Sequence, residues 1–343
     1  MPILVERYPY ADTSFPSSSA PSKHPTSGSR SASIDIALIN NMPDAAMEAT
    51  VRQFLSLLGA ASQNVVIHLK LFSMPGVPGS QWRRQHLSGH YSDFDEFWDS
   101  RFDGVIVTGT EPRADDLTAE PYWADLARVV DWAEANTTAS VWSCLAAHAA
   151  VQHLDGIRRS PLDRKCFGVF EHASMSDHWL LRGQPRMIPA PHSRWNGVCE
   201  GALASAGYQV LSKSTAGVDI FIKERRSLFL FFQGHPEYGA DTLAREYRRD
   251  VARYLRGERA SYPELPKHYF DYATTEMLNA FRARAVAERG EDLMAGFPTD
   301  HVLKAVRHTW YSHAVRTYTN WVNHIVECKA PAARQLPRRV GAG

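Results

Sequence analysis

The sequence has few cysteines, and the few it has are far apart. Only four of the 343 residues are cysteine, and no two of them form a CxxC pair (Cys144, Cys166, Cys199 and Cys328). Such wide spacing argues against a disulfide framework and against a cysteine-rich zinc site. We therefore expect reduced thiols and a cytoplasmic protein.

An excess of either charge is also missing, as are long apolar runs. The 38 Lys and Arg nearly balance the 37 Asp and Glu, which leaves no basic surplus to neutralise a row of phosphates. The apolar run Ser227–Phe232 is far shorter than the roughly 20 residues of a membrane span, and Met1–Arg7 lacks the features of a signal peptide. We expect no nucleic-acid partner and no membrane contact.

One segment differs in composition from the rest of the chain. Thr13 to Ser33 contains nine serines and three prolines and hardly any large apolar residue, so it cannot bury enough surface to offset its ordering entropy. We predict a mobile leader over 1–33, a single α/β domain over 34–328 and a frayed tail over 329–343.

Apolar periodicity in the first half of the domain alternates between the patterns of strands and helices. Strands are expected at 34–39, 65–71, 102–109 and 139–143, and helices at 45–58, 122–135 and 145–153. Further on we expect a meander of strands over 209–232 and helices over 240–255 and 309–326. The alternation predicts an α/β fold, a mostly parallel sheet with helices on both faces.

Cys144 follows an expected strand and precedes an expected helix. A nucleophile on such a turn is exposed at the carboxyl edge of the sheet, and the helix amino end favours the thiolate. The backbone N–H of Leu145 is a candidate donor to a developing oxyanion. The alternative for an isolated cysteine is a buried structural role, because free cysteine packs well as a small hydrophobe.

His235 and Glu237 change that balance. They stand in Gly234-His-Pro-Glu-Tyr238, directly after a very apolar strand. A cysteine nucleophile needs a base to accept its proton and a third group to orient that base. Taken alone, His235 could be a loop histidine next to a proline, but together with Cys144 it predicts a catalytic triad.

Eight segments in this order resemble one known family: Met1-Pro-Ile, Leu38–Pro43, Val105–Gly109, Lys165–His172, Pro191–Arg194, Gly234–Tyr238, Thr242–Asp250, and Ser312-His313 with Thr319–Trp321. The cysteine after a strand and the His-x-Glu resemble the class I glutamine amidotransferase-like fold. Within it, the chain resembles the homoserine O-succinyltransferase/O-acetyltransferase family of methionine biosynthesis.

This resemblance implies transfer of an acyl group from succinyl-CoA or acetyl-CoA to the hydroxyl of homoserine, through an acyl-enzyme on Cys144. It implies His235 as the proton acceptor and Glu237 as its orienting group, with no permanently bound cofactor. Lys165, Ser193 and Arg249 fall on the family's substrate-contact positions. Without the resemblance, a solvated helix face is the favoured interpretation of Arg249. A homodimer is compatible with the sequence.

Metal binding is not expected. None of the fifteen histidines falls in an HxH or HxxxH pair supported by a cysteine or carboxylate at ligand spacing. His148 and His153 are five residues apart on an expected helix and do not share a face.

Two loops depart from the family pattern. Asn41–Ala46 lacks the usual lysine pair, and Thr110–Arg113 replaces the usual Ala-Pro. In the family, the second loop selects the acyl donor. Counting from Gly109 puts Arg113 at the selecting position, where it could pair with the succinyl carboxylate while Glu111 points elsewhere, to Arg113 itself. We therefore favour succinyl-CoA over acetyl-CoA.

Three alternatives stay open on the sequence. The acceptor could be serine or another hydroxy amino acid. The chain could be a glutaminase-type cysteine amidohydrolase on the same fold, or a relative that retains the fold for binding alone.

Overall fold

The computed structural model describes residues 3–8 and 32–334 of the chain. Its largest element is an eight-stranded sheet in the order β1-β3-β2-β4-β5-β12-β11-β8. The strands are β1 (Ile3–Val5), β2 (Ser33–Ile39), β3 (Val66–Phe72), β4 (Gly104–Val107), β5 (Ala139–Ser143), β8 (Gln209–Val210), β11 (Ile220–Glu224) and β12 (Leu228–Phe232). Every pairing from β1 to β12 is parallel, and the pairings of β11 are antiparallel. The predicted α/β fold with a mostly parallel sheet is confirmed.

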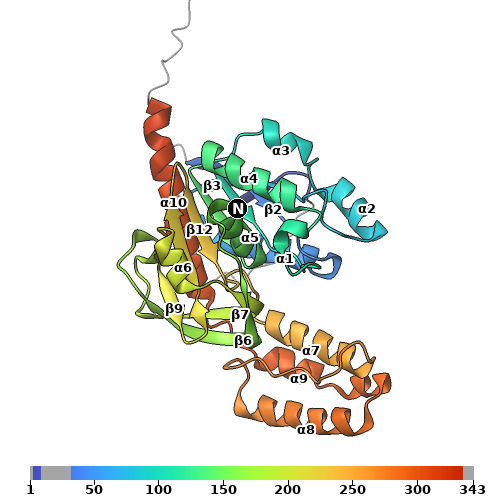
Figure 1. Cartoon of the computed structure of the whole chain (residues 1–343). Helices are drawn as coiled ribbons and strands as arrows, with labels where there is room; N and C mark the ends of the chain where they lie inside the picture. The colour runs from blue at the N-terminus through green and yellow to red at the C-terminus, as the bar shows by residue number, and fades with distance from the viewer. Residues whose placement is uncertain (1–2, 9–31, 335–343) are drawn as a thin grey trace, which may run out of the picture.

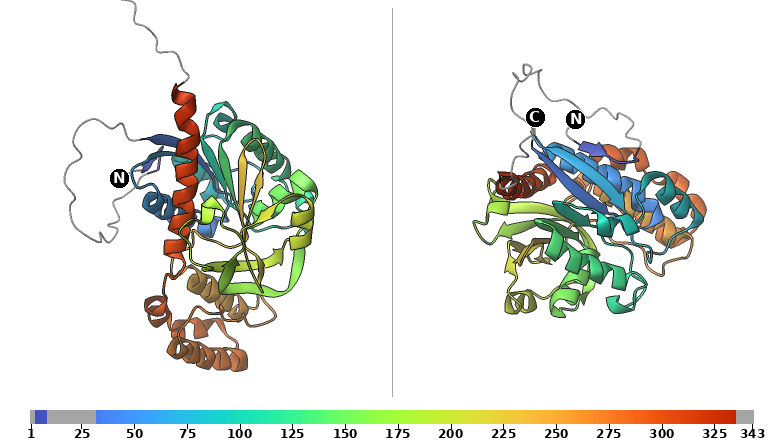
Figure 2. Two further views of the ribbon diagram at one scale, coloured as in Figure 1. Left: turned by 90° about the vertical axis from the view of Figure 1, so that its left-hand side faces the viewer. Right: turned by 90° about the horizontal axis from the view of Figure 1, so that it is seen from above.

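Helices cover both faces of this sheet (Figures 1 and 2). One face carries α1 (Asp44–Ala61) and the long α10 (Tyr311–Arg334), and the other carries α4 (Trp123–Asn136) and α5 (Leu145–Asp155). Along β12, Leu230 and Phe232 pack on the face that carries α1 and α10, whereas Phe229 and Phe231 pack on the face that carries α4 and α5. Since both faces are buried, the strand reads as one continuous apolar run.

A second, four-stranded sheet has the order β10-β9-β6-β7. The strands are β6 (Ser160–Ser174), β7 (Met187–Gly197), β9 (Ser212–Ser214) and β10 (Gly217–Val218), all paired antiparallel. The expected meander over 209–232 was therefore only partly right, because its strands are divided between two sheets. The long β6–β7 hairpin was not predicted.

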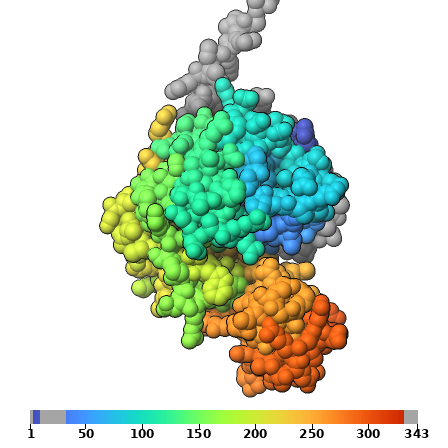
Figure 3. Space-filling model, turned by 45° about the vertical axis from the view of Figure 1, so that its right-hand side comes forward, coloured from blue at the N-terminus to red at the C-terminus, as the bar shows by residue number. Residues whose placement is uncertain are grey.

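Three helices form a separate group below the sheets in Figure 1 and project as a lobe in Figure 3: α7 (Thr242–Leu255), α8 (Tyr272–Glu288) and α9 (Thr299–Ala305). They share a core around Tyr247, Leu278 and Trp310. Shorter helices are α2 (Gln81–His90), α3 (Asp95–Asp99) and α6 (Glu200–Ser205), with 3-10 turns at Leu117–Ala119, Trp179–Leu181 and Glu291–Gly296.

Two expected boundaries differ from the structure. Ile3–Val5 pairs with β3 as the edge strand of the sheet, so the start of the expected leader belongs to the fold. Residues 9–31, which hold most of the Ser/Pro-rich segment, lie outside the described part. The last helix runs through Arg334, beyond the expected boundary at Lys329. None of the described helices is both long and apolar enough to cross a bilayer.

Candidate active site

Cys144 stands between β5 and α5 in a strained conformation. Its φ of 53° and ψ of −112° lie outside the regions that L-residues usually adopt, and its N–H donates to the carbonyl of Phe232 at 2.7 Å. This is the sharp strand-to-helix turn that exposes a nucleophile at the edge of a sheet. The side chain is partly exposed.

His235 and Glu237 reach the same point from the neighbouring strand. β12 runs parallel to β5, with Phe232 opposite Ser143, so the two strand ends meet at one edge. His235 Nδ1 and Glu237 Oε1 are 3.0 Å apart, and Cys144 is close enough to raise the pKa of His235 by its charge and by a hydrogen bond. The three residues predicted as a triad therefore lie together in the order that proton transfer requires.

The surroundings of His235 favour its protonated form. Burial disfavours the imidazolium, but the charges of Cys144 and Glu237 and the hydrogen bonds to both raise the pKa of His235 well above its ordinary value. The ring of Tyr238 stacks on the imidazole, with centroids 4.2 Å apart. The imidazole is thus held on its face as well as through its ring nitrogens.

The oxyanion candidate lies at the start of α5. A Cβ on Gly109 would come within 3.0 Å of the Leu145 nitrogen and 2.9 Å of the Leu145 Cβ. Only glycine allows the loop after β4 to pass this close to the first turn of α5. The Leu145 N–H is therefore confined between this loop and the Cys144 turn.

The three expected substrate contacts converge on two carboxylates of α7. Ser193 Oγ donates to Glu246 Oε2 at 2.5 Å, Lys165 Nζ lies 3.5 Å from Asp250 Oδ2, and Arg249 donates to Asp250 Oδ1 at 3.1 Å. Burial lowers the pKa of Lys165, against the opposing effect of both carboxylates. The structure brings Lys165, Ser193 and Arg249 into one polar network.

Glu246, Asp250 and Tyr238 were missed from the sequence. Tyr238 donates through its hydroxyl to Glu246 Oε1 at 2.6 Å, so it joins the imidazole of His235 to the carboxylate network. The sequence did contain a signal for this network. Glu246 and Asp250 are like charges four residues apart on a helix, and such a pair destabilises the helix unless a cation balances it. Lys165 of β6 lies near both carboxylates, and Arg249 and Arg259 pair with Asp250, but no local pattern predicts that β6 packs against α7.

A cavity of about 810 Å³ extends from this network between α1, α7 and α9. Pro236, Glu237 and Tyr238 line it at the catalytic end, and Glu246 and Arg249 line it on α7. Four further arginines lie along its walls (Arg52, Arg245, Arg248 and Arg253). The cavity combines an apolar floor with cationic walls.

The loop after β4 does not take the expected arrangement. Glu111 lines the cavity, and it is one of the carboxylates whose charge favours the cationic form of Arg249, after Asp250 and Glu246. The expectation that Glu111 points away to Arg113 was wrong, because Glu111 faces cationic α7. Arg113 is exposed and is not among the cavity residues, and its N–H donates to the buried carboxylate of Glu120.

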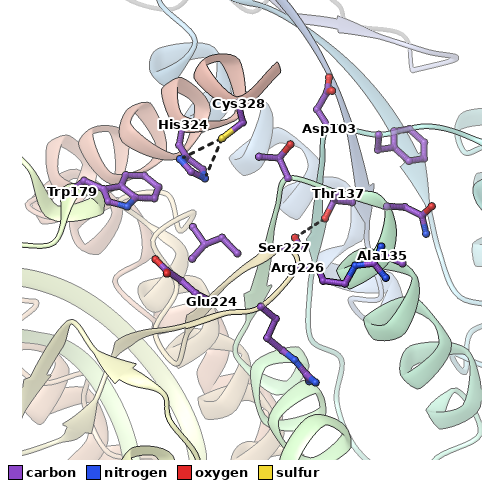
Figure 4. A pocket seen from close by; sticks show the side chains of 14 residues that line it. Asp103, Ala135, Thr137, Trp179, Glu224, Arg226, Ser227, His324 and Cys328 are labelled. Carbon is purple, nitrogen blue, oxygen red and sulfur yellow. Dashed lines mark hydrogen bonds between the residues drawn. The ribbon is translucent and has the colours of Figure 1, made fainter. Parts of the chain in front are cut away.

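Two other features lie outside this constellation. A cavity of about 610 Å³ opens at the opposite edge of the sheet, where Thr137, Ser227, His324 and Cys328 line it (Figure 4). His172, His192 and Asp219 form a buried group at metal-ligand spacing. Sequence spacing alone could not find this group, because its members stand on β6, on β7 and just before β11.

Comparison with known proteins gives a family and a set of relatives. The family model for homoserine O-succinyltransferase matches residues 21–332. A homoserine O-succinyltransferase of Rhodopseudomonas palustris is 47% identical over 84% of this chain and 87% of its own length. One of Bradyrhizobium japonicum is 44% identical over 90% of this chain and 96% of its own.

Among solved structures, a glutamine amido transferase of Methylobacillus flagellatus is similar with a TM-score of 0.49. It is 14% identical and covers 86% of this chain and 96% of its own.

Proposed function

Since the chain belongs to the homoserine O-succinyltransferase family, we propose that it transfers the succinyl group of succinyl-CoA to the hydroxyl of homoserine. The family membership confirms the prediction made from the motif segments. The observation that carries the proposed mechanism is the meeting of Cys144, His235 and Glu237 at one edge of the sheet, in series, with His235 Nδ1 3.0 Å from Glu237 Oε1. Such a series is the arrangement by which a thiol acts as a covalent nucleophile.

The first half-reaction forms the acyl-enzyme. The thiolate of Cys144 attacks the thioester carbon of the donor, and the Leu145 N–H stabilises the negative oxygen that develops there. The carbon–sulfur bond to coenzyme A then breaks, and His235 gives its proton to the leaving thiolate. Glu237 keeps the imidazole oriented and balances its charge.

The second half-reaction regenerates the cysteine. His235, now neutral, accepts the proton of the acceptor hydroxyl as the oxygen attacks the acyl carbon of Cys144. The sulfur leaves as a thiolate beside the renewed imidazolium. Protons and electrons balance over the two steps without any cofactor or metal.

The carboxylate network suits a zwitterionic acceptor. Glu246 and Asp250 are acceptors for an ammonium group, and the planar fork of Arg249 suits a carboxylate. Arg249 now contacts Asp250, so substrate binding would require this contact to be shared or exchanged.

The cationic walls of the cavity suit the nucleotide of the donor. Coenzyme A carries several phosphate charges, and arginine recognises phosphate through charge-assisted hydrogen bonds. Arg248 and Arg253 have no carboxylate within ion-pair distance among residues 3–8 and 32–334, so their charges are available. We place the acyl chain at the Glu237 end and the nucleotide along α7.

Acetyl-CoA is the second candidate donor, and the position of Glu111 favours it. A carboxylate in the cavity wall would repel the distal carboxylate of a succinyl group unless Arg249 or another cation compensates for it. Measuring kcat/KM for both donors in wild type, Glu111→Ala and Arg113→Ala separates these readings. Preference for succinyl-CoA in the wild type supports the proposal, and preference for acetyl-CoA contradicts it.

The acceptor and the reaction type are tested by thiol release. Purified protein is incubated with succinyl-CoA and, in turn, homoserine, serine or buffer, and separately with glutamine to detect a glutaminase. We expect rapid release of coenzyme A with homoserine only. Faster turnover of serine, or ammonia from glutamine, would reassign the function.

A further inference from the structure

Behind the catalytic histidine lies a buried polar group that the proposed chemistry does not use. His172 and His192 are 0% exposed and Asp219 is 2% exposed. One nitrogen or oxygen of each lies within 4.8 Å of those of the other two. Buried polar atoms nearly always have partners, yet Nε2 of both histidines forms no hydrogen bond in the described part of the chain.

Neighbouring groups define where the protons of the two histidines lie. His172 Nδ1 is 2.9 Å from the carbonyl of Phe170, and a carbonyl only accepts, so Nδ1 carries the proton and Nε2 a lone pair. Arg194 Nε donates to His192 Nδ1 at 3.3 Å, so in neutral His192 the proton is on Nε2. That N–H faces Asp219 Oδ1, at 3.5 Å.

This proton order disfavours a metal ion. A metal at this group would need a lone pair on His192 Nε2, but the lone pair of that ring accepts from Arg194. The guanidinium of Arg194 also places a positive charge beside the group, which opposes a cation there. His192 and Asp219 therefore have partners that need no cation, whereas His172 Nε2 has no hydrogen-bond partner among the described residues.

The same group holds the turn that carries His235. Asp219 Oδ1 accepts the N–H of Gly234 at 2.9 Å, and the His235 N–H donates to the carbonyl of Pro191, the residue before His192, at 2.9 Å. A Cβ on Gly234 would lie 2.8 Å from Asp219 Oδ1 and 3.1 Å from His192 Cε1. The absence of a side chain at Gly234 lets this pair reach the catalytic backbone.

We infer that His192 and Asp219 are positioning residues, which fix the backbone at Gly234 and His235 so that the imidazole meets Cys144. The inference rests on the proposed roles of Cys144 and His235. His192 orients the Asp219 carboxylate, and the carboxylate holds the N–H of Gly234. Neither side chain contacts the reacting atoms, so both act through the backbone of β12 and its turn.

The test is the rate at which iodoacetamide alkylates each cysteine between pH 6 and 9, followed by peptide mass spectrometry. We expect Asp219→Ala and His192→Ala to slow alkylation of Cys144 near pH 7 by about tenfold and kcat by on the order of 10–100-fold, because an error of about 1 Å in a catalytic group has that effect. His192→Gln keeps one hydrogen-bond acceptor and one donor. Relative to His192→Ala, it should restore most of the alkylation rate of Cys144 and most of kcat. Asp219→Asn keeps the shape of the side chain, and it replaces Asp219→Ala in both measurements where the alanine variant fails to fold.

The other cysteines provide internal references. Cys199 and Cys328 are exposed and should keep their rates, whereas faster alkylation of buried Cys166 would report general unfolding. Four titratable groups act electrostatically on the Cys144–His235 pair or lie against it: Glu237, Tyr238, Cys166 and His192. The pH profiles are therefore compared among variants that keep Glu237, Tyr238 and Cys166 unchanged. Ser227→Ala, a buried hydroxyl at the other end of β12, is the matched control.

The outcomes separate this inference from the proposed function. If His235→Asn leaves alkylation of Cys144 unchanged, the catalytic pair fails and this inference fails with it. If His235→Asn slows alkylation but Asp219→Ala and His192→Ala do not, the positioning role alone is overturned. Zinc at one equivalent per chain, lost in His172→Ala and Asp219→Ala, would replace it with a metal site.

Discussion

The two ends of one strand pair differ in how fully their polar groups are satisfied. β5 and β12 run parallel over five paired residues. At their amino ends, Thr137 and Ser227 hydrogen-bond to each other at 3.0 Å, and Thr137 also donates to Ala133 at 2.7 Å. At their carboxyl ends, Cys144 has a positive φ, and Glu237 Oε2 is buried without a hydrogen-bond partner among the described residues.

This difference is a better indicator of function than the presence of a hollow. A cavity lies at each edge of the sheet, about 610 Å³ at the amino edge and 810 Å³ beside the carboxyl edge. The backbone of the amino edge is regular and its hydroxyls are paired, whereas the carboxyl edge holds strain at Cys144 and a buried carboxylate oxygen without a hydrogen-bond partner among the described residues. Strain and unsatisfied polar groups of this kind persist where a reaction uses them.

The largest expected effect is the loss of the nucleophile at the strained end. We expect Cys144→Ala to abolish transfer, because Cys144 is the nucleophile of the proposed mechanism and Cys166, the other thiol near the pair, is buried. Intact-mass spectrometry with succinyl-CoA alone should show an adduct of one succinyl group on wild type and none on the variant. A wild-type protein that turns over without ever showing the adduct would contradict the covalent mechanism.

Removal of the base should have the next largest effect. Loss of a general base commonly lowers kcat by about 10²–10⁴-fold, and we expect His235→Asn to fall in that range, with Glu237→Gln no more harmful. The measurement is steady-state kcat with homoserine saturating. Near-normal turnover in His235→Asn would remove this histidine from the mechanism.

A smaller effect is expected at the acceptor site. Arg249→Lys replaces a planar fork with a point charge, so the acceptor KM should rise about tenfold while kcat changes less, the effect of losing one charged hydrogen bond. Arg256→Lys is the matched control, because Arg256 lies just beyond the same helix and pairs with exposed Glu258. Equal KM values in the two variants would return Arg249 to a solvated helix face.

The pH dependence of the free energy of unfolding tests a buried group at the carboxyl end of β12. Wholly buried His148 contacts Gln233 Oε1 at 3.0 Å, and burial lowers its pKa to about 4. An unfolded histidine binds its proton near pH 6.5, so between that pH and about 4 the unfolded state is favoured as the pH falls, by up to about 3 kcal/mol. Urea unfolding at pH 7 and 4.5 should show a smaller loss in His148→Gln than in wild type.

How much the sequence could predict depends on whether an element carries its own signal. β12 and the turn at Cys144 were predictable, because an apolar run buried on both faces and a cysteine before a small-residue helix are local patterns. The β6–β7 hairpin was not, since polar residues such as Asp163, Arg164 and Lys165 interrupt its alternation. Helix α8 has almost no amphipathic pattern, because apolar residues such as Met277 and Val286 are exposed while Leu278 and Phe281 are buried on the other face.

The candidate site shows the same division. Cys144, His235 and Glu237 each follow a recognisable strand, so their meeting at one edge follows from parallel pairing. His192 and Asp219 come together only through contact between the two sheets, and Glu246 meets Ser193 only through the packing of α7 on β7. Contacts of that kind depend on how sheets and helices pack, which no local pattern encodes.

The smallest expected effect tests the satisfied end of the strand pair. Ser227→Ala removes the hydroxyl that contacts Thr137, but Thr137 keeps its bond to Ala133, so no buried donor is left unpaired. We expect a loss of about 1 kcal/mol or less in the free energy of unfolding, the usual net value of one neutral hydrogen bond. Turnover and alkylation of Cys144 should equal those of wild type, because the change lies at the opposite edge of the sheet. A marked loss of kcat with unchanged stability would mean that the amino edge communicates with the catalytic turn along β12, and the functional contrast between the two ends would then be wrong.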